Sequence, residues 1–137
     1  MKKREPVSKI MTSDVITLNH TDNLNTAEQL FKENNIRHIP VVSGASIIGM
    51  LRLTDLLRIS FAGAANGNEV DTTVYNMFTI EQVMAKNIVS VNSDTTVKEA
   101  AEILSTKEFH ALPVVNDGEL AGIVTTTDMI NYLLGQY

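Results

Sequence analysis

The chain contains an internal repeat that covers most of its length. Residues 7–61 align with residues 80–134 without a gap, and several motifs are identical in the two copies: Pro40-Val41-Val42 and Pro113-Val114-Val115, Gly49 and Gly122, and Thr54-Asp55 and Thr127-Asp128. A unit that repeats in register usually cannot bury its apolar face alone and stacks on its copy. We therefore expect the function to lie between the two copies.

Composition narrows the class of protein. The chain has 137 residues, of which 44% are hydrophobic and 20% charged, which is typical of a single soluble domain. No apolar run approaches the roughly 20 residues of a membrane span, and the charged start is not followed by the apolar stretch of a signal peptide. The absence of cysteine excludes disulfides, thiolate metal sites and a thiol nucleophile. We expect a cytoplasmic protein that does not bind membranes.

The charge argues against nucleic acid as a partner. The net charge is −5, whereas binding to a phosphate backbone needs a basic patch. The only basic cluster is Lys2-Lys3-Arg4, which we interpret as part of a solvated tail.

Both copies predict the same order of elements, β-α-β-β-α. Short β-branched runs at 15–18 and 88–91 predict a first strand, and apolar residues at helical spacing predict helices after Asn23 and Thr96. Asn23 is a good N-cap, and Thr96 with Glu99 forms the pattern of a capping box.

Two strands and a final helix complete each copy. The turns at 43–45 and 116–118 predict hairpins, the second strongly through Asp117-Gly118. Pro40 and Pro113 lack an N–H, so we expect those strands to begin there or to lie at a sheet edge. Gly49 and Gly122 indicate a close backbone approach. The last helices are expected to begin at 54–55 and 127–128, and the polar connector between the copies to be mobile near 63–73.

Each copy has Pro-Val-Val before the hairpin turn, and after the turn it has a Gly that is followed six residues later by an Asp. This pattern resembles the CBS domain, and two such domains in tandem resemble a Bateman module. The resemblance implies an α+β fold in which two small sheets pack face to face about a pseudo-twofold axis, with two equivalent clefts between them. On this basis we divide the chain into a tail (1–6), a first repeat (7–61), a connector (62–79) and a second repeat (80–137). The resemblance also implies that such modules pair into a homodimer and bind adenosine compounds such as AMP, ADP, ATP, NAD or S-adenosylmethionine.

The family's ligand motif consists, in order, of Gly, two apolar residues, Ser or Thr, any two residues and Asp. The resemblance implies that this Asp binds the two hydroxyl groups of the ligand's ribose. A carboxylate can accept both O–H groups side by side. The second copy matches fully, from Gly122 to Asp128. The first copy keeps Asp55 but has Arg52 in place of Ser or Thr, so Arg52 could fill that cleft or bind a phosphate.

The resemblance implies that each cleft takes residues from both copies. The cleft of Asp128 would contain Ile123, Thr125, Thr127, Thr12, Ile16, Ile36, Arg37 and His38. The other cleft would contain Met50, Arg52 and Asp55 together with Ala85, Val89, Phe109, His110 and Ala111. Arg37, His38 and His110 are the expected phosphate contacts, as cationic donors in an acidic chain.

Each of these residues has a simpler interpretation. Asp55 and Asp128 would stabilise a helix N-terminus through the macrodipole, by about 0.3–1 kcal/mol, with Thr54 and Thr127 as N-caps. His38 and His110 could be ordinary hydrogen-bonding residues. Arg37 and Arg52 could be ion-pair partners at the surface.

No catalytic machinery is recognisable, because the sequence has no Gly-rich phosphate loop, no Ser/His/Asp order and no cluster of metal ligands. We therefore predict a protein that is not an enzyme and requires no cofactor. The leading hypothesis is a regulatory module that binds an adenosine nucleotide and signals to an unknown effector protein. The alternative is a structural or dimerisation module of the same fold whose clefts bind no ligand.

Overall fold

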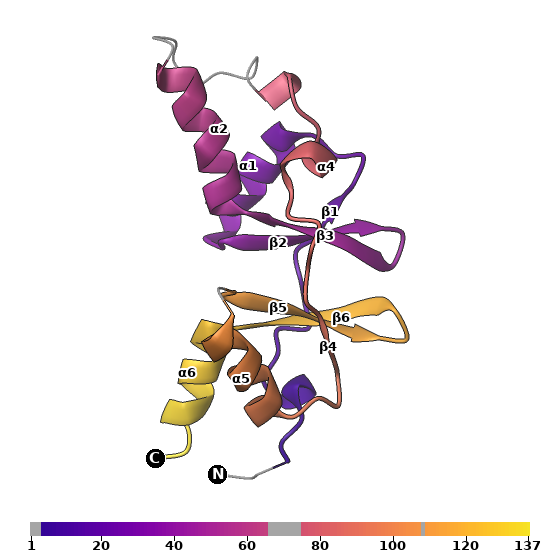
Figure 1. Ribbon diagram of the computed structural model, residues 1–137, viewed down its shortest axis with the longest axis vertical. Helices are drawn as coiled ribbons and strands as arrows, with labels where there is room; N and C mark the ends of the chain where they lie inside the picture. The colour runs from indigo at the N-terminus through magenta and orange to yellow at the C-terminus, as the bar shows by residue number, and fades with distance from the viewer. Residues whose placement is uncertain (1–3, 66–74, 108) are drawn as a thin grey trace. The chain divides into compact units, whose positions relative to one another are not determined.

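The computed structural model describes residues 4–65, 75–107 and 109–137, and for 61–65 the backbone only. Its fold is α+β, as the sequence predicts (Figure 1). The predicted order β-α-β-β-α occurs in each repeat: β1 Leu18–Asn19, α1 Leu24–Asn34, β2 His38–Ser43, β3 Ser46–Arg52 and α2 Leu53–Ala65, then β4 Val91–Asn92, α5 Val97–Thr106, β5 Ala111–Asn116, β6 Glu119–Thr125 and α6 Thr126–Leu134. A short 3-10 helix, Val7–Lys9, precedes β1, and helix α4, Ile80–Val83, precedes β4.

The chain forms two compact units that differ from the sequence repeats at their edges. Unit 1 consists of Met1–Val15 and Val89–Tyr137, and unit 2 of Ile16–Ile88. The start of each repeat therefore belongs to the unit of the other repeat. In unit 1 the exchange is held by backbone hydrogen bonds: Val7 N–H donates to the Thr95 carbonyl, and Val97 N–H to the Glu5 carbonyl, both at 2.7 Å.

Within each unit the sheet has the same topology. Strands β1 and β2 are parallel and β2 and β3 antiparallel, and β4, β5 and β6 repeat this arrangement. The helices of each unit lie on one face of its own sheet (Figure 1). The core of unit 2 includes Leu18, Leu24, Ile39 and Leu51, all fully buried. The core of unit 1 includes Val7, which lies in the segment exchanged from the first repeat.

One expectation about the strands needs correction. Glu5 and Pro6, which we assigned to the tail, pair with the second repeat, since the Glu5 carbonyl accepts the Val97 N–H and Pro6 forms a β-bridge with Thr96. The first strands, expected at 15–18 and 88–91, are only β1 and β4, because a strand needs a partner and the parallel pairing begins at Leu18 and Val91. The preceding β-branched residues lie where the chain passes from one unit to the other.

The prolines were expected at a strand start or a sheet edge, and the strand pairing gives each of them a local edge. Pro40 lies inside β2, between β1 and β3. It is tolerated because β1 reaches only Val41 and Val42, so that position 40 is an edge locally. Its partner across the hairpin, Met50, exchanges its backbone hydrogen bonds with Ala85 instead, at 2.9 and 3.0 Å. Pro113 and Ile123 have the same relation in unit 1.

Several local predictions are confirmed. Asn23 caps α1 by accepting the Thr26 N–H at 2.9 Å. Asp117 and Gly118 have φ values of 49° and 82°, which is typical of a tight hairpin turn. Thr96 caps α5, although the Glu99 carboxylate accepts from the Thr96 hydroxyl rather than completing a capping box with the backbone.

Helix α2 continues into the predicted connector as far as Ala65. Most of the segment expected to be mobile, near 63–73, lies outside the described residues, which end at 65 and resume at 75. Among the helices that the structure describes, none has the length and hydrophobicity needed to span a membrane.

Candidate functional site

The candidate site in unit 1 is the motif that ends β6 and begins α6. Thr125 is the N-cap of α6, and its hydroxyl oxygen accepts the Asp128 N–H at 3.1 Å. In return, Asp128 Oδ2 accepts the Thr125 N–H at 2.9 Å, so that the two residues form a capping box. The expected cap at Thr127 is therefore wrong: Thr127 lies in the first turn of the helix and is exposed.

This arrangement leaves part of the Asp128 carboxylate available. No residue that the structure describes donates a hydrogen bond to Oδ1, and the side chain is only partly buried. Because Oδ2 accepts the Thr125 N–H at the start of the helix, the orientation of the carboxylate is fixed. Oδ1 is then available to accept a hydrogen bond from a ligand. Such a group can accept hydroxyl donors from a ligand at the positive end of a helix dipole.

The segment before β1 lies against this motif. Thr12 and Ile123 exchange backbone hydrogen bonds, with N···O distances of 2.8 and 2.9 Å. Gly122 permits this contact, because a Cβ atom at position 122 would lie 2.8 Å from the Thr12 carbonyl oxygen. The close backbone approach predicted for this glycine is confirmed, and Gly49 has the same relation to Ala85 in unit 2, at 2.9 Å.

The equivalent motif in unit 2 has the same backbone geometry and a different side chain. Asp55 Oδ2 accepts the Arg52 N–H at 3.0 Å, which matches the bond between Asp128 and Thr125. Arg52 has no hydroxyl to cap α2, and its guanidinium instead binds both carboxylate oxygens, through Nε to Oδ2 at 3.0 Å and through Nη2 to Oδ1 at 2.7 Å. The Asp55 side chain is 5% exposed.

The ion pair settles one of the alternatives left open by the sequence. Arg52 is an ion-pair partner, and the acid that it binds is Asp55 itself. The hydrogen bond and charge of Asp55 raise the pKa of Arg52 above its ordinary value. The spacing of Arg and Asp three residues apart at a helix start is a signal that could have predicted this pair. Thr54, the expected cap of α2, lies inside the helix, which begins at Leu53.

The predicted site residues are distributed over both units. Unit 2 places His38 opposite Arg52 on β2 and β3, and the Arg37 carbonyl accepts the Leu53 N–H at 2.9 Å. Unit 1 places Ala111 opposite Thr125, and the His110 carbonyl accepts the Thr126 N–H at 3.0 Å. Each unit thus brings its Pro-Val-Val strand next to its own Asp motif. Of the remaining predicted residues, Ile16, Ile36 and Met50 belong to unit 2, and Val89 and Phe109 belong to unit 1.

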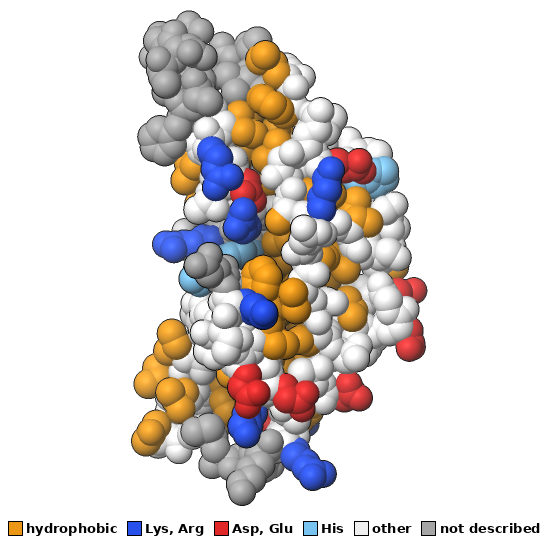
Figure 2. Space-filling model, viewed as in Figure 1, with side chains coloured by type: hydrophobic (Ala, Val, Ile, Leu, Met, Phe, Trp, Pro, Cys, Tyr) orange, Lys and Arg blue, Asp and Glu red, His pale blue; other side chains and the backbone are white. Residues whose placement is uncertain are grey.

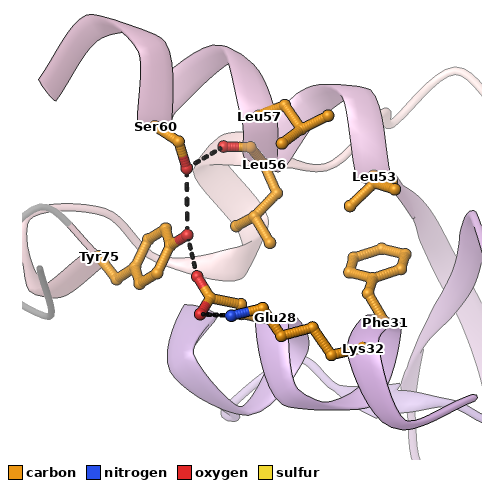
Figure 3. A pocket seen from close by; sticks show the side chains of 8 residues that line it. All are labelled: Glu28, Phe31, Lys32, Leu53, Leu56, Leu57, Ser60 and Tyr75. Atoms are coloured by element: carbon orange, nitrogen blue, oxygen red, sulfur yellow. Dashed lines mark hydrogen bonds and ion pairs between the residues drawn. The ribbon is translucent and has the colours of Figure 1, made fainter. Parts of the chain in front are cut away.

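A pocket that the sequence did not predict lies in unit 2 between α1 and α2 (Figure 3). It has a volume of about 280 Å³ and is lined by Glu28, Phe31, Lys32, Leu53, Leu56, Leu57, Ser60 and Tyr75. Tyr75 lies outside both repeats and has no counterpart in the other copy, so comparing the copies could not reveal it.

The polar groups of this pocket bind one another. The Tyr75 hydroxyl donates to Glu28 and contacts Ser60 Oγ at 3.1 Å, and Lys32 Nζ donates to Glu28 at 2.9 Å (Figure 3). The hydrogen bonds from Tyr75 and Lys32 lower the pKa of Glu28, while burial and the bond to Glu28 raise the pKa of Tyr75. Because these groups are already paired, we regard the pocket as a structural link between α1, α2 and Tyr75. Among the residues described, no group of three or more His, Asp or Glu side chains could hold a metal ion.

Comparison with known proteins identifies the family. The CBS domain family matches residues 7–62 and again residues 80–135, so the chain belongs to the CBS domain family and carries the domain twice, in tandem.

Individual relatives agree with this assignment. The chain is 31% identical to the uncharacterized protein MJ1404 of Methanocaldococcus jannaschii over 96% of its own length and 32% of that protein. A structure of a putative acetoin utilization protein, AcuB, from Vibrio cholerae has a TM-score of 0.81 at 26% identity, covering 96% of this chain and 91% of that one. The CBS domain pair of protein MJ0100, solved with 5-methylthioadenosine and S-adenosyl-L-methionine, has a TM-score of 0.79 at 25% identity, covering 96% and 98%.

The curated relatives are mostly longer proteins. The chain spans 32%, 48% and 23% of the first three that it matches. The similarity therefore concerns the domain pair that they share with this chain.

Proposed function

We propose that this chain is a regulatory CBS domain pair that binds an adenosine compound through Asp128. The observation that carries the proposal is the geometry of the second motif, in which Oδ2 accepts the Thr125 N–H and Oδ1 has no donor among the residues that the structure describes. A ribose offers two adjacent hydroxyl donors, which suit such a carboxylate. The similarity to the ligand-bound domain pair of MJ0100 supports the choice of an adenosine compound.

Further residues of the same unit would complete the ligand contacts. Thr125 Oγ1 accepts from the Asp128 backbone, so its own hydrogen is available to a ligand. His110 is exposed, and its carbonyl accepts the N–H of Thr126, the residue after Thr125, so that the two segments are adjacent. Its side chain would offer a donor for a phosphate. Ile123 and Thr12, which pair through their backbones in the same unit, would add an apolar side chain and backbone groups.

The proposed mechanism is regulation by linkage rather than catalysis. A ligand that binds one conformation better than another shifts the population towards that conformation. At 100 times its dissociation constant a ligand stabilises the bound form by about 2.7 kcal/mol, which is enough to reverse a balanced equilibrium. The output would pass to an effector protein.

We propose further that the protein acts as a homodimer. In α6 the side chains of Ile130, Leu133 and Leu134 are 57%, 44% and 64% exposed. Hydrophobic side chains gather over this helix (Figure 2). Apolar residues at this spacing on one helix favour packing against another protein surface, and a second copy of the chain would provide one.

A structural module that binds no ligand is the second candidate. The observation that favours it is the ion pair between Arg52 and Asp55, which occupies both oxygens of the first motif's carboxylate. If the second motif were equally closed in solution, the chain would act only through dimerisation.

Thermal unfolding with a panel of ligands distinguishes the two candidates. The panel is AMP, ADP, ATP, NAD, S-adenosylmethionine and 5-methylthioadenosine, applied to the wild type, Asp128→Asn and Asp117→Asn. Asn at 128 can still accept the Thr125 N–H but offers an amide donor in place of the second acceptor. Asp117→Asn is the matched control, since it makes the same change at an exposed turn of the same unit.

We expect at least one ligand to raise the melting temperature of the wild type and of Asp117→Asn but not of Asp128→Asn. No shift with any ligand would favour the structural module. A shift that persists in Asp128→Asn would refute the assignment of Asp128. Formation of ADP from ATP at a catalytic rate would identify an enzyme instead.

A further inference from the structure

The two Asp motifs differ in the side chain that precedes the final helix, and this difference has a consequence for ligand binding. We propose that Arg52 closes the first motif by occupying Asp55, so that the chain has one nucleoside site instead of two. This inference rests on the proposed function in taking the open Asp128 motif as the functional form of the site.

The closure is visible in the hydrogen bonds of Asp55. Its Oδ1 accepts from Arg52 Nη2 at 2.7 Å, and its Oδ2 accepts from Arg52 Nε and from the Arg52 backbone, both at 3.0 Å. The planar guanidinium matches a carboxylate in this two-point geometry better than a single ammonium would. Both oxygens that could hold ligand hydroxyls are therefore engaged within one turn of the chain.

The second motif provides the comparison within the same molecule. Asp128 makes the equivalent backbone bond, to Thr125 at 2.9 Å, and no described side chain occupies its other oxygen. The preceding strands have the same register in the two units: His38 lies opposite Arg52, and Ala111 opposite Thr125. The Arg in place of Thr is thus the difference that decides whether the carboxylate is open.

A ligand at the first motif must displace the guanidinium. A nucleoside without a phosphate offers Arg52 no anion in place of Asp55. The free energy of its binding is therefore reduced by the free energy needed to break the ion pair. If the open form is a minor population, the apparent affinity falls in proportion to that population. For a charge-assisted pair of this kind we expect a loss of about tenfold or more.

Titration calorimetry with 5-methylthioadenosine tests the closure, because this nucleoside carries no phosphate. The variants are Arg52→Thr, Asp128→Asn and the double variant Arg52→Thr/Asp128→Asn. Arg52→Thr places at this position the residue that the second motif has there, and it supplies the hydroxyl cap that α2 lacks, so we expect it to fold. Arg58→Thr on the exposed side of α2 is the control for the change of charge.

We expect the wild type and Arg58→Thr to bind one equivalent, Asp128→Asn none, and Arg52→Thr two. The double variant should keep one equivalent at the opened first motif. The reciprocal change Thr125→Arg should abolish the wild-type site without altering Asp128.

The outcomes separate this inference from the proposed function. If the wild type binds nothing but both variants with Arg52→Thr bind one equivalent, Arg52 is confirmed as the closing residue and the assignment of Asp128 is refuted. If Arg52→Thr binds no more than the wild type, the closure is refuted whatever the wild type does. Two equivalents of this nucleoside in the wild type would also refute it, since the first motif would then be open to a ligand without a phosphate.

Discussion

The contact between Gly122 and Thr12 allows a quantitative prediction for Gly122→Ala. The added Cβ would lie 2.6 Å from Met11 Sδ and 2.8 Å from the Thr12 carbonyl oxygen. The Met11 side chain can rotate away. The carbonyl cannot move without weakening the two backbone hydrogen bonds between Thr12 and Ile123, at 2.8 and 2.9 Å.

The expected cost follows from these two contributions. Overpacking a close contact costs about 1–3 kcal/mol, and weakening the two backbone hydrogen bonds without breaking them adds about 1 kcal/mol in total. We expect Gly122→Ala to lower the free energy of unfolding by about 2–4 kcal/mol. For a chain of 137 residues this corresponds to a fall in melting temperature of roughly 6–15 °C.

Urea denaturation followed by circular dichroism measures this loss, with Gly135→Ala as the control. Gly135 has a φ of −68°, and a Cβ there would make only ordinary contacts, the nearest at 3.4 Å. The control should be neutral or slightly stabilising, because Ala has less freedom than Gly in the unfolded chain. A Gly122→Ala protein within 0.5 kcal/mol of the wild type, on the order of an ordinary surface change, would refute the close packing of the 11–12 segment against β6.

Substitutions at three further residues test local features. Tyr75→Phe should cost about 1 kcal/mol by removing a donor to Glu28. That bond lowers the pKa of Glu28, so its stabilisation is present above the ordinary value of 4.5 and is lost as the pH falls through the lowered value. In urea titrations at several pH values, the free energy of unfolding of Tyr75→Phe should therefore fall less steeply with acid than that of the wild type. An unchanged pH dependence would contradict the pairing. Thr125→Val should cost about 1 kcal/mol through loss of the α6 cap, and equal stability in urea would argue against it. Asn35→Ala should cost about 1 kcal/mol because residue 35 has a φ of 52°, whereas Asn35→Gly should not; equal stability of the two would refute the left-handed cap.

The sequence predicted the elements because their signals are local. The Asn23 cap, the Asp117-Gly118 turn and the helical spacing of apolar residues each depend on neighbours within a few positions. The glycines of the two motifs were also informative, since both copies have a glycine at the point of closest backbone approach.

The exchange of segments between the repeats was not predictable from these local patterns. Val7 is an apolar residue before a predicted strand, and nothing in its neighbourhood indicates that its N–H bonds to Thr95, far along the chain. For the same reason the first strands were predicted too early. The β-branched residues before Leu18 and Val91 favour a strand, but an extended segment becomes a strand only where a partner is available.

The candidate site was predicted in part. The repeat revealed that Asp55 and Asp128 are equivalent in sequence, and the structure shows that they make the same backbone hydrogen bond. Their side-chain environments differ because Arg52 binds only Asp55. The partner of a long side chain depends on its conformation, and the sequence left several partners possible for Arg52. Tyr75 was missed because it lies in the connector.

A crystal structure of the protein grown with 5-methylthioadenosine tests the central claim most directly. Our account predicts the ribose hydroxyls on the carboxylate of Asp128, with Arg52 still bound to Asp55 in the other unit. A nucleoside bound away from Asp128, or an Asp128 whose two oxygens contact only the protein's own backbone in the complex, would contradict it.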